Sequence, residues 1–350
     1  MSFSILGLAH QSPEYSLGQE STAQFAKGLC CSSEQDERLL DALYRRTRIR
    51  KRGSVLLNET GGMTSNEFYT LPQKGSDPGP GTRARMQKYE DYSSGLAVSA
   101  CRRALGKTNL SASEITHLMT VTSTGLLSPG IDYQICRDMN LDSDIHRIQI
   151  GFMGCHAALN ALAVAAGFAA AAPTARVLIC AVELCSLHFQ YGWDPDRVVS
   201  NAIFSDGAGA IVGASGSPET AEETWKLVAS GSHLVDDSAD AMTWRIGDNG
   251  FLMTLSANLP ELIQRQLPGW IDGWLSRHDY RRDQIKSWAI HPGGPRILTA
   301  AEKALGISST ATRASKEVLV ENGNMSSATL VFVLEKMITE GHQKPCVALG

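Results

Sequence analysis

The sequence predicts an α/β fold made of two similar halves. Short apolar runs typical of buried strands alternate with longer segments of helical pattern along most of the chain. Four pairs of landmarks are also separated by the same 169 positions: Thr122 and His291 at strand ends, Gly125 and Gly294 after them, Cys155 and Asn324 at helix starts, and Val177 and Cys346 at strand starts. This constant offset predicts two pseudo-symmetric halves whose strand ends and helix N-termini converge on one site.

Composition and charge narrow the class of protein. With 350 residues, 43% hydrophobic, and a net charge of -4, the chain has a globular composition and no general attraction to nucleic acid or anionic membranes. The longest apolar tract, residues 157–172, contains Asn160 and Gly167 and is too short to be expected to span a bilayer. We find no pattern of a secretion signal, and the eight scattered cysteines suggest reduced thiols. We therefore expect a cytoplasmic protein.

The first third of the chain contains the following expected elements. Residues 1–33 hold one strand and then a polar, weakly patterned region, and residues 54–84 are rich in Gly, Pro, Ser and Asn and indicate a long surface loop. Acidic residues in the first turn and arginines in the last favour a helix over Glu34–Arg46. The strands expected here are Ser4–Ala9 and Thr116–Thr122, and the other helices are Met86–Leu105 and Asp132–Met139.

The middle of the chain carries a strand, a tight turn and an Ala-rich helix. The apolar run Ile148–Phe152 predicts a buried strand, Gly151 and Gly154 bracket the turn, and Cys155 opens a helix to about Ala171. Two further strands are expected, a buried one over Arg176–Val182 and a Gly/Ala-rich one over Ala208–Val212.

A boundary near residues 213–223 divides the chain into an N-terminal half, 1–217, and a C-terminal half, 218–350. The elements expected in the second half are a strand over Trp225–Ser230, a helix over Pro260–His278, a strand over Ile285–Ile290, a polar linker to Asn322, a helix from Asn324 to about Glu340 and a strand over Cys346–Leu349. At the same offset, the counterpart of the 208–212 strand would fall near positions 377–381. We therefore expect the second half to lack its last strand, either because the sequence is incomplete or because something else covers an open sheet edge.

Three side chains are candidates for covalent chemistry. A cysteine on a strand-to-helix turn, such as Cys155, lies where unpaired N–H groups and the helix dipole favour a thiolate, although a lone cysteine is more often a buried structural residue. An imidazolium at His291 would lower the thiol pKa and form an ion pair with it. The carboxamide of Asn324 could donate to an oxyanion, or orient the histidine as in thiol proteases.

Four motifs make the interpretation specific. Gly151-Phe-Met-Gly-Cys155, Phe204-Ser-Asp-Gly-Ala-Gly-Ala210, His291-Pro-Gly-Gly-Pro295 and Gly323-Asn-Met-Ser-Ser-Ala328 resemble the signatures of type III polyketide synthases. This is the chalcone/stilbene synthase family of the thiolase superfamily, and the resemblance runs from about Tyr89 to Gly350, more weakly before. It implies a duplicated thiolase-like fold with αβαβα layers, and a homodimer. Ketoacyl-ACP synthase III has the same fold and triad but typically lacks the last two motifs in these forms.

The resemblance implies a role for each motif residue. Cys155 would accept a starter acyl group from a CoA thioester, and His291 and Asn324 would hold the thioester carbonyl of malonyl-CoA while it decarboxylates to an enolate. Phe204 would present an aromatic face to the malonyl carboxylate, unless it is a plain core residue. A Claisen condensation would follow, with CoA thioesters as substrates and no metal, flavin or nicotinamide cofactor.

The resemblance also assigns binding residues. A basic run at residues 45–52 indicates a solvated surface, a nucleic-acid patch or a phosphate site. The resemblance favours a site for the phosphates of CoA at Arg46. Two other positions that are usually basic in the family hold Leu39 and Ala42 here, and Arg48, Arg50 and Arg52 would compensate for them. The cavity positions are Ser123, Cys185, His188, Trp244, Met253 and Ser326. Trp244 replaces a small residue, so we expect a narrowed cavity, or alternatively a tryptophan packed in the core.

The sequence thus favours an acyltransferase that makes a short polyketide of the pyrone, resorcinol or phloroglucinol type from acyl-CoA and malonyl-CoA. Two alternatives stay open: a ketoacyl-ACP synthase III-like enzyme that uses an acyl carrier, and a non-catalytic acyl-CoA-binding homologue. A nucleic-acid role is not expected, because the basic run has no interleaved aromatic residues and no reader motif.

Overall fold

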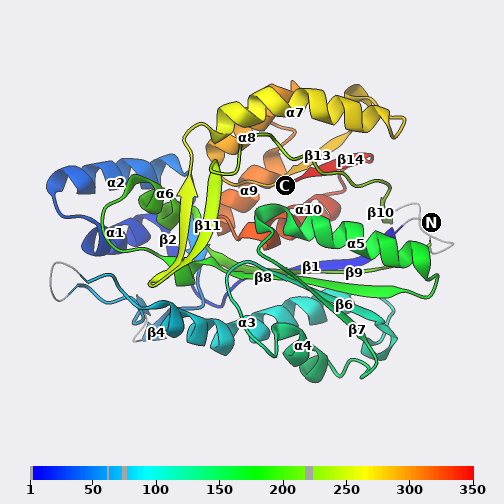
Figure 1. Ribbon diagram of the computed structural model, residues 1–350, viewed down its shortest axis with the longest axis horizontal. Helices are drawn as coiled ribbons and strands as arrows, with labels where there is room; N and C mark the ends of the chain where they lie inside the picture. The colour runs from blue at the N-terminus through cyan, green and yellow to red at the C-terminus, as the bar shows by residue number, and fades with distance from the viewer. Residues whose placement is uncertain (1–2, 61–62, 73–76, 217–223) are drawn as a thin grey trace.

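A six-stranded sheet forms the centre of the first half. The computed structural model describes residues 3–60, 63–72, 77–216 and 224–350. The strand order is β10-β1-β9-β8-β6-β7 (Figure 1). Parallel pairs join β6 to β7 and to β8, while β9 runs antiparallel to both β8 and β1. The bounds are β1 Phe3–Gln11, β6 His117–Thr122, β7 His146–Gly151, β8 Arg176–Leu184, β9 Asp206–Ser215 and β10 Trp225–Leu227.

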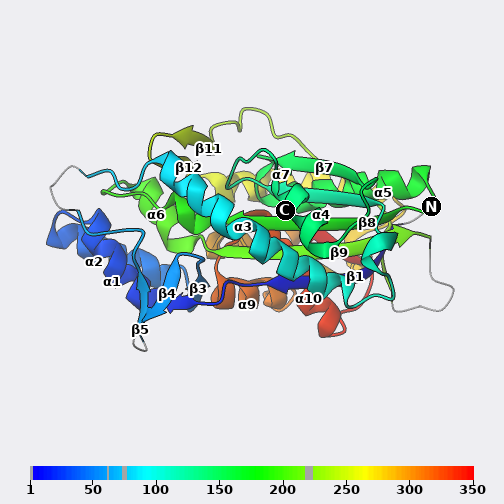
Figure 2. The ribbon, with the colours of Figure 1, turned by 90° about the horizontal axis from the view of Figure 1, so that it is seen from below.

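Helices cover both faces of this sheet. The long helix α3 (Thr82–Leu105) packs on β1, β8 and β9, with α4 (Ile131–Met139) beside it, as Figure 2 shows from below. On the opposite face lie α5 (Ala157–Ala171) and α10 (Thr329–Thr339). The buried face of α5 is almost wholly alanine, which lets the helix approach the strands closely.

The second half adds a smaller sheet and an outer helical layer. Among the described residues this sheet consists of β13 (Ser287–Ile290) and β14 (Cys346–Leu349), which run parallel. Residues of α10 contact β13 and also β1 and β9, so α10 lies between the two sheets. On the outer side, α7 (Leu259–Ser276) and α8 (Pro295–Leu305) share a core with β13 and β14. The layers are therefore αβαβα, as the duplicated thiolase-like fold requires.

Several predicted elements are confirmed. The helix α2 spans Glu34–Arg46 as predicted, and its first turn is capped because the Ser33 side chain accepts a hydrogen bond from the Asp36 N–H. The last strand, β14, also has its predicted bounds. The boundary expected between residues 217 and 218 lies outside the described residues.

Other segments are more ordered than predicted. The expected polar linker before Asn322 contains α8 and α9 (Arg313–Asn322), whose buried faces carry Leu298, Leu305, Val318 and Leu319. The polar N-terminal region contains β2 (Ser16–Gly18) and α1 (Gln19–Cys30), and the expected 54–84 loop contains β4 (Leu57–Thr60), β5 (Met63–Asn66) and the start of α3. Elements not predicted at all are β3 (Lys51–Gly53), α6 (Pro195–Ile203), β11 (Met242–Gly247) and β12 (Gly250–Leu255).

A strand precedes Cys155 as predicted, but the prediction that this strand is buried was wrong. β7 is the edge strand of the large sheet, and four of its six residues are exposed. The following segment, Gly154–Ala171, is long and apolar enough to cross a membrane by length and composition, with a third of it buried. Its buried side packs on the six-stranded sheet, which is the behaviour of a core helix.

Candidate active site

Cys155 lies on the turn that joins β7 to α5. The strand ends at Gly151, and Phe152 and Gly154 then take positive φ angles of 55° and 67°. A short 3₁₀ turn, η2 (Gly154–His156), precedes the helix, so Cys155 lies just before α5 rather than at its first residue. The Gly154 N–H donates to the Ser123 hydroxyl at 3.3 Å, which joins this turn to the end of β6.

His291 follows the last residue of β13. Its backbone N–H donates to the Leu349 carbonyl of β14 at 2.8 Å, so the neighbouring strand fixes the position of the histidine backbone. The imidazole is buried, and within the described part of the chain neither ring nitrogen has a hydrogen-bond partner. Both nitrogens therefore remain able to bond to a substrate.

Asn324 lies between α9 and a 3₁₀ turn, η5 (Ser326–Ala328). Its Oδ1 accepts from the Ser326 N–H at 2.8 Å, and its Nδ2 donates to the Gly293 carbonyl, two residues from His291, at 3.4 Å. The backbone of Asn324 forms a parallel bridge with Phe204 at the end of α6. Asn324 is thus attached both to the loop of His291 and to the first half.

The two turns that carry Cys155 and Asn324 pack against each other. The Cys155 Sγ lies 3.7 Å from the Ser326 Oγ, and η2 contacts η5. The structure therefore brings together the segments of Cys155, His291, Asn324 and Phe204, which are remote in sequence. The 169-residue offset predicts this convergence for Cys155, His291 and Asn324.

Burial sets the protonation of the candidate triad. It raises the pKa of the Cys155 thiol to about 11, against the opposing effect of hydrogen bonds from Ser326 and Asn324. Burial also lowers the pKa of the His291 imidazole to about 4, helped by the nearby His156. Desolvation therefore opposes the expected thiolate–imidazolium pair, because burial penalises both charged forms, and the pair stays a prediction. The raised thiol pKa and the lowered imidazole pKa both favour the uncharged forms near neutral pH.

This protonation state predicts how Cys155 reacts with alkylating agents. The iodoacetamide rate, followed at Cys155 by peptide mass spectrometry, should rise about tenfold per pH unit between pH 7 and pH 9, because only the thiolate reacts and its fraction grows with pH below a raised pKa. The partly buried cysteine Cys136 provides an internal comparison in the same digest. A rate at Cys155 that is already constant from pH 6 upward would show a stable ion pair and contradict the prediction.

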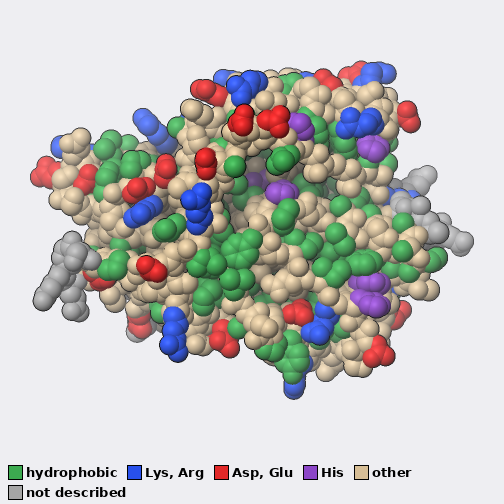
Figure 3. All heavy atoms as spheres, in the orientation of Figure 1, with side chains coloured by type: hydrophobic (Ala, Val, Ile, Leu, Met, Phe, Trp, Pro, Cys, Tyr) green, Lys and Arg blue, Asp and Glu red, His purple; other side chains and the backbone are tan. Residues whose placement is uncertain are grey.

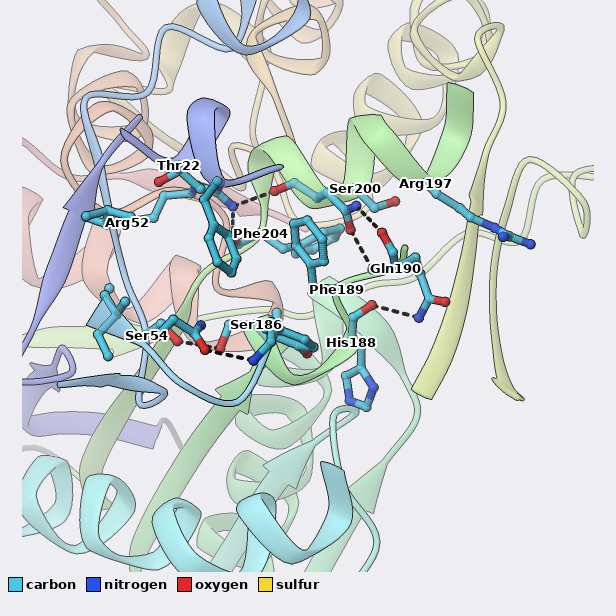
Figure 4. A pocket seen from close by; sticks show the side chains of 18 of the residues that line it. Thr22, Arg52, Ser54, Ser186, His188, Phe189, Gln190, Arg197, Ser200 and Phe204 are labelled. Carbon is cyan, nitrogen blue, oxygen red and sulfur yellow. Dashed lines mark hydrogen bonds between the residues drawn. The ribbon is translucent and has the colours of Figure 1, made fainter. Parts of the chain in front are cut away.

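A cavity of about 440 Å³ lies beside these turns. Figure 4 shows Phe204 and Phe189 on one side of it and Ser54 and Ser186 on the other. Of the six predicted cavity positions, four line it: Cys185, His188, Trp244 and Met253. Phe204 also lines it, whereas Cys155, His291 and Asn324 do not, so the cavity adjoins the triad across Phe204 and Cys185.

The other two predicted positions lie between the cavity and Cys155. Ser326 faces the Cys155 sulfur, and the Ser123 carbonyl accepts a hydrogen bond from the Trp244 Nε1 at 2.7 Å. The indole ring packs edge-on against His188 and Phe251. Trp244 is therefore a wall of the cavity, and the alternative that it packs in the core away from it is excluded.

His188 is fixed as a neutral wall residue. Its Nδ1 accepts from the Phe251 N–H at 2.9 Å, its Nε2 donates to the Thr124 carbonyl at 2.8 Å, and its ring stacks on Phe251. Burial lowers its pKa to about 3. His188 therefore contributes shape to the cavity and no proton transfer near neutral pH.

The basic run divides into exposed and buried arginines. Arg46 and Arg48 are exposed, and Arg50 is exposed but forms an ion pair with Glu321. Arg52 is only 8% exposed, and its guanidinium donates to Gln19 and to the carbonyls of Asn201 and Phe204. The prediction that Arg52 binds phosphate is therefore wrong, because its guanidinium is directed into the protein and bonds to the segment that carries Phe204.

Two buried carboxyl groups were missed. Glu183 in β8 accepts hydrogen bonds from the Ser123 N–H at 3.0 Å and from the Thr124 and Ser327 hydroxyls, and burial raises its pKa to about 7. It thereby connects the end of β6 to η5. Asp206 accepts from the Ser186 N–H at 2.8 Å beside the cavity, and burial raises its pKa to about 6. The sequence did contain a signal for Glu183, because it is a charged residue within a mostly apolar strand.

A metal or cofactor would have to be held by side chains of the protein. Across residues 3–60, 63–72, 77–216 and 224–350, no group of three or more His, Cys, Asp or Glu side chains is arranged to hold a metal ion. The cavity walls are mostly apolar, which suits an acyl chain. The independence from cofactors stays a prediction.

Two family models cover nearly the whole chain. Residues 3–216 match "Chalcone and stilbene synthases, N-terminal domain", and residues 226–348 match the corresponding C-terminal domain. The alpha-pyrone synthesis polyketide synthase-like Pks18 of Mycobacterium tuberculosis is 33% identical over 99% of this chain and 86% of its own length. Type III polyketide synthase 10 of Oryza sativa is 30% identical over 97% of this chain and 84% of its own.

Solved structures agree with the sequence matches. PKS-I of the brown alga Ectocarpus siliculosus superposes with a TM-score of 0.91 at 31% identity, over 97% of this chain and 90% of that one. The 1,3,6,8-tetrahydroxynaphthalene synthase of Streptomyces coelicolor superposes with a TM-score of 0.84 at 26% identity, over 97% and 91%.

Proposed function

The chain belongs to the chalcone and stilbene synthase family, the type III polyketide synthases, and from this we propose that it condenses malonyl-CoA with an acyl starter held on Cys155. The observation that carries the proposal is the contact between the turn of Cys155 and the turn of Asn324, with the loop of His291 bonded to the same asparagine. Family membership decides against the ketoacyl-ACP synthase III alternative.

Each step has a group in this site. The His291 imidazole, neutral at rest, accepts the Cys155 proton as the thiolate attacks the thioester carbonyl of the starter acyl-CoA, and CoA leaves as a thiol. Malonyl-CoA then places its thioester oxygen between the His291 N–H and the Asn324 carboxamide. Loss of CO₂ leaves an enolate whose negative oxygen these donors stabilise. The enolate carbon attacks the Cys155 thioester, and the lengthened chain then returns to the sulfur.

Phe204 supplies the apolar surroundings that favour decarboxylation. It borders both the cavity and Asn324, so a malonyl carboxylate beside its ring would lose hydration. A carboxylate is destabilised there relative to neutral CO₂, which lowers the barrier to C–C cleavage. No metal or redox cofactor takes part in this scheme.

The proposal is tested by incubating the full chain with ¹⁴C-malonyl-CoA and a panel of aliphatic and aromatic acyl-CoAs. We expect labelled products larger than the starter by whole malonyl-derived two-carbon units, identified by mass spectrometry. An acyl carrier protein loaded with the same acyl groups is the comparison substrate. Condensation only from the carrier-bound starter would contradict the proposal.

We propose that Trp244 limits the length of the product. Its indole is held by the hydrogen bond to the Ser123 carbonyl and occupies cavity space beside His188. Trp244→Gly should therefore shift the main product upward by at least one malonyl unit in mass spectra. The control Trp244→Phe keeps most of the bulk but removes the Nε1 hydrogen bond, and it should retain the parent product. An unchanged product from Trp244→Gly would disprove the role.

We propose that Arg46 and Arg48 bind the phosphates of CoA, since both guanidinium groups are exposed near the last turn of α2. The double variant Arg46→Ala/Arg48→Ala should raise KM for malonyl-CoA about tenfold or more, because a charge-assisted hydrogen bond contributes about 1.5–3 kcal/mol. The value of kcat should stay near that of the parent. Arg281→Ala, an exposed arginine of the second half, is the matched control.

A homodimer and a cytoplasmic location complete the proposal. Among the described residues no strand pairs with the outer side of the edge strand β7, and the apolar side chains Leu126, Phe152 and Met153 are exposed near its end. Size-exclusion chromatography with light scattering should give twice the chain mass. All eight cysteines are free thiols, which suits a reducing compartment.

A further inference from the structure

Two histidines lie side by side at the starting ends of neighbouring strands, at the opposite end of the sheet from the Cys155 turn. His117 is the first residue of β6 and His146 the first of β7, and the parallel register pairs them directly. Their ring centroids are 4.9 Å apart, and the ring planes are inclined by 26°. We call these two residues the histidine pair. Figure 3 shows histidine side chains together at the surface, over the region where Figure 1 labels β6 and β7.

The histidine pair lies at the end of an apolar row. Alternate residues of a strand point to the same face of a sheet, so the pair continues the row of Met119 and Val121 in β6 and of Ile148 and Ile150 in β7. These four side chains belong to the core that the sheet shares with α5. The row therefore ends in two imidazoles where the cover of α5 ends and solvent begins.

The contacts of His117 orient its ring for a ligand. Phe168, in the last turn of α5, packs on the ring with the centroids 4.4 Å apart. On its other side the Nδ1 lies 2.7 Å from the Thr116 Oγ1, which is also 3.1 Å from the Arg176 carbonyl and accepts from the Arg176 N–H at 2.9 Å. With the hydroxyl proton on that carbonyl, the Thr116 oxygen accepts from the His117 Nδ1–H. The Nε2 lone pair is then left for a metal ion, which is the usual arrangement of a metal-bound histidine.

The other ring nitrogens of the pair have no protein partner within the described part of the chain. This holds for the His117 Nε2 and for both nitrogens of His146, whose side chain is exposed. Burial lowers the pKa of the His117 imidazole, and the charge of a protonated His146 lowers it further. The neutral form of His117, which is the form that binds metals, is therefore favoured near neutral pH.

We propose that His117 and His146 bind one Zn²⁺ ion at the surface through two imidazole nitrogens. Imidazole ligands suit zinc and its neighbours rather than magnesium or calcium. Tetrahedral Zn–N bonds of about 2.0–2.1 Å need the two nitrogens about 3.3 Å apart, a separation that the exposed His146 ring reaches by turning toward His117. Nowhere in the described ranges does a third His, Cys, Asp or Glu side chain form a metal-binding group with the pair, so water completes the coordination.

The ion would hold the edge strand β7 to β6. The six residues of β7 separate it from the Cys155 turn by about 17 Å of extended strand, so the ion takes no part in the proposed reaction. Because it binds the folded chain, in which the two ligands are neighbours, saturating Zn²⁺ should raise the Tm by about 2–5 °C.

The test is a calorimetric titration of the full chain, free of any histidine tag, with ZnCl₂ at pH 7.5. We expect His117→Gln and His146→Gln each to weaken one equivalent of Zn²⁺ binding by tenfold or more and to abolish the rise in Tm. Thr116→Val, which removes the acceptor of the Nδ1–H, should weaken it by about tenfold. The matched control is His233→Gln, an exposed histidine of the second half, which should bind like the parent.

X-ray absorption at the zinc edge identifies the ligands independently. The first shell should contain nitrogen and oxygen at about 2.0–2.1 Å, whereas binding by the free cysteines would show sulfur at about 2.3 Å. A sulfur shell, equal uptake by the parent and both histidine variants, or no uptake by the parent up to about 1 mM Zn²⁺ would each overturn the proposal. These measurements need no substrate, so their outcome is separate from that of the proposed reaction.

Discussion

Cys155→Ala should abolish condensation while malonyl-CoA decarboxylation stays measurable. The sulfur is the only group in the proposed scheme that carries the growing chain, so its loss should lower kcat/KM for product formation by roughly 10⁴-fold or more. In the proposed scheme His291 and Asn324 stabilise the enolate, and both residues are retained in this variant. Acetyl-CoA released from malonyl-CoA, measured by chromatography, should therefore persist without any condensed product.

The matched control for this experiment is Cys136→Ala. Cys136 is a partly buried free thiol in α4, outside the proposed site, and its loss should change neither reaction. Residual condensation by Cys155→Ala at more than a hundredth of the parent rate would mean that another nucleophile carries the acyl group. The adjacent cavity thiol Cys185 would be the first to test by a second substitution.

Asn324→Asp should remove decarboxylation without unfolding the site. Aspartate keeps an oxygen that can accept from the Ser326 N–H, as Asn324 Oδ1 does, but it loses the N–H₂ donor and adds a negative charge beside the developing enolate. Removal of one oxyanion donor typically costs a factor of about 10²–10³ in rate, and the charge adds to this loss. We expect the decarboxylation rate to fall at least that far, with condensation falling in parallel.

Asn109→Asp, an exposed asparagine in a loop, is the control for the added charge. Thermal unfolding of both variants separates a catalytic loss from a structural one. If Asn324→Asp melts like the parent and retains its decarboxylation rate, the carboxamide does not stabilise the enolate. The role would then pass to His291 and to backbone donors.

The repeat in the sequence was sufficient to predict the convergence of the site, because pseudo-symmetry constrains geometry at long range. A strand end at Thr122 and another at His291 must occupy equivalent places in the two halves, as must the turns of Cys155 and Asn324. The helix α2 was also predicted with its bounds, since its signals are local: acidic residues at its start and arginines at its end.

Other features depend on tertiary contacts that no local pattern encodes. Arg52 belongs to the same basic run as Arg48, and only its contacts with Gln19 and Asn201 reveal that it is buried. The pKa shifts of Cys155 and His291 likewise follow from their burial, which no local pattern reveals. The helices α8 and α9 were missed, although the buried side chains Leu298 and Leu305 of α8 have helical spacing.

The parallel bridge between Phe204 and Asn324 has a consequence for how the enzyme is made. Because one backbone contact spans 120 positions and joins the ends of two different halves, the reaction centre cannot form while the first half alone has left the ribosome. Competence must arise late in biosynthesis, after Asn324 has emerged from the ribosome. Expressing the two halves as separate genes should therefore yield catalysis only when both are present and associated.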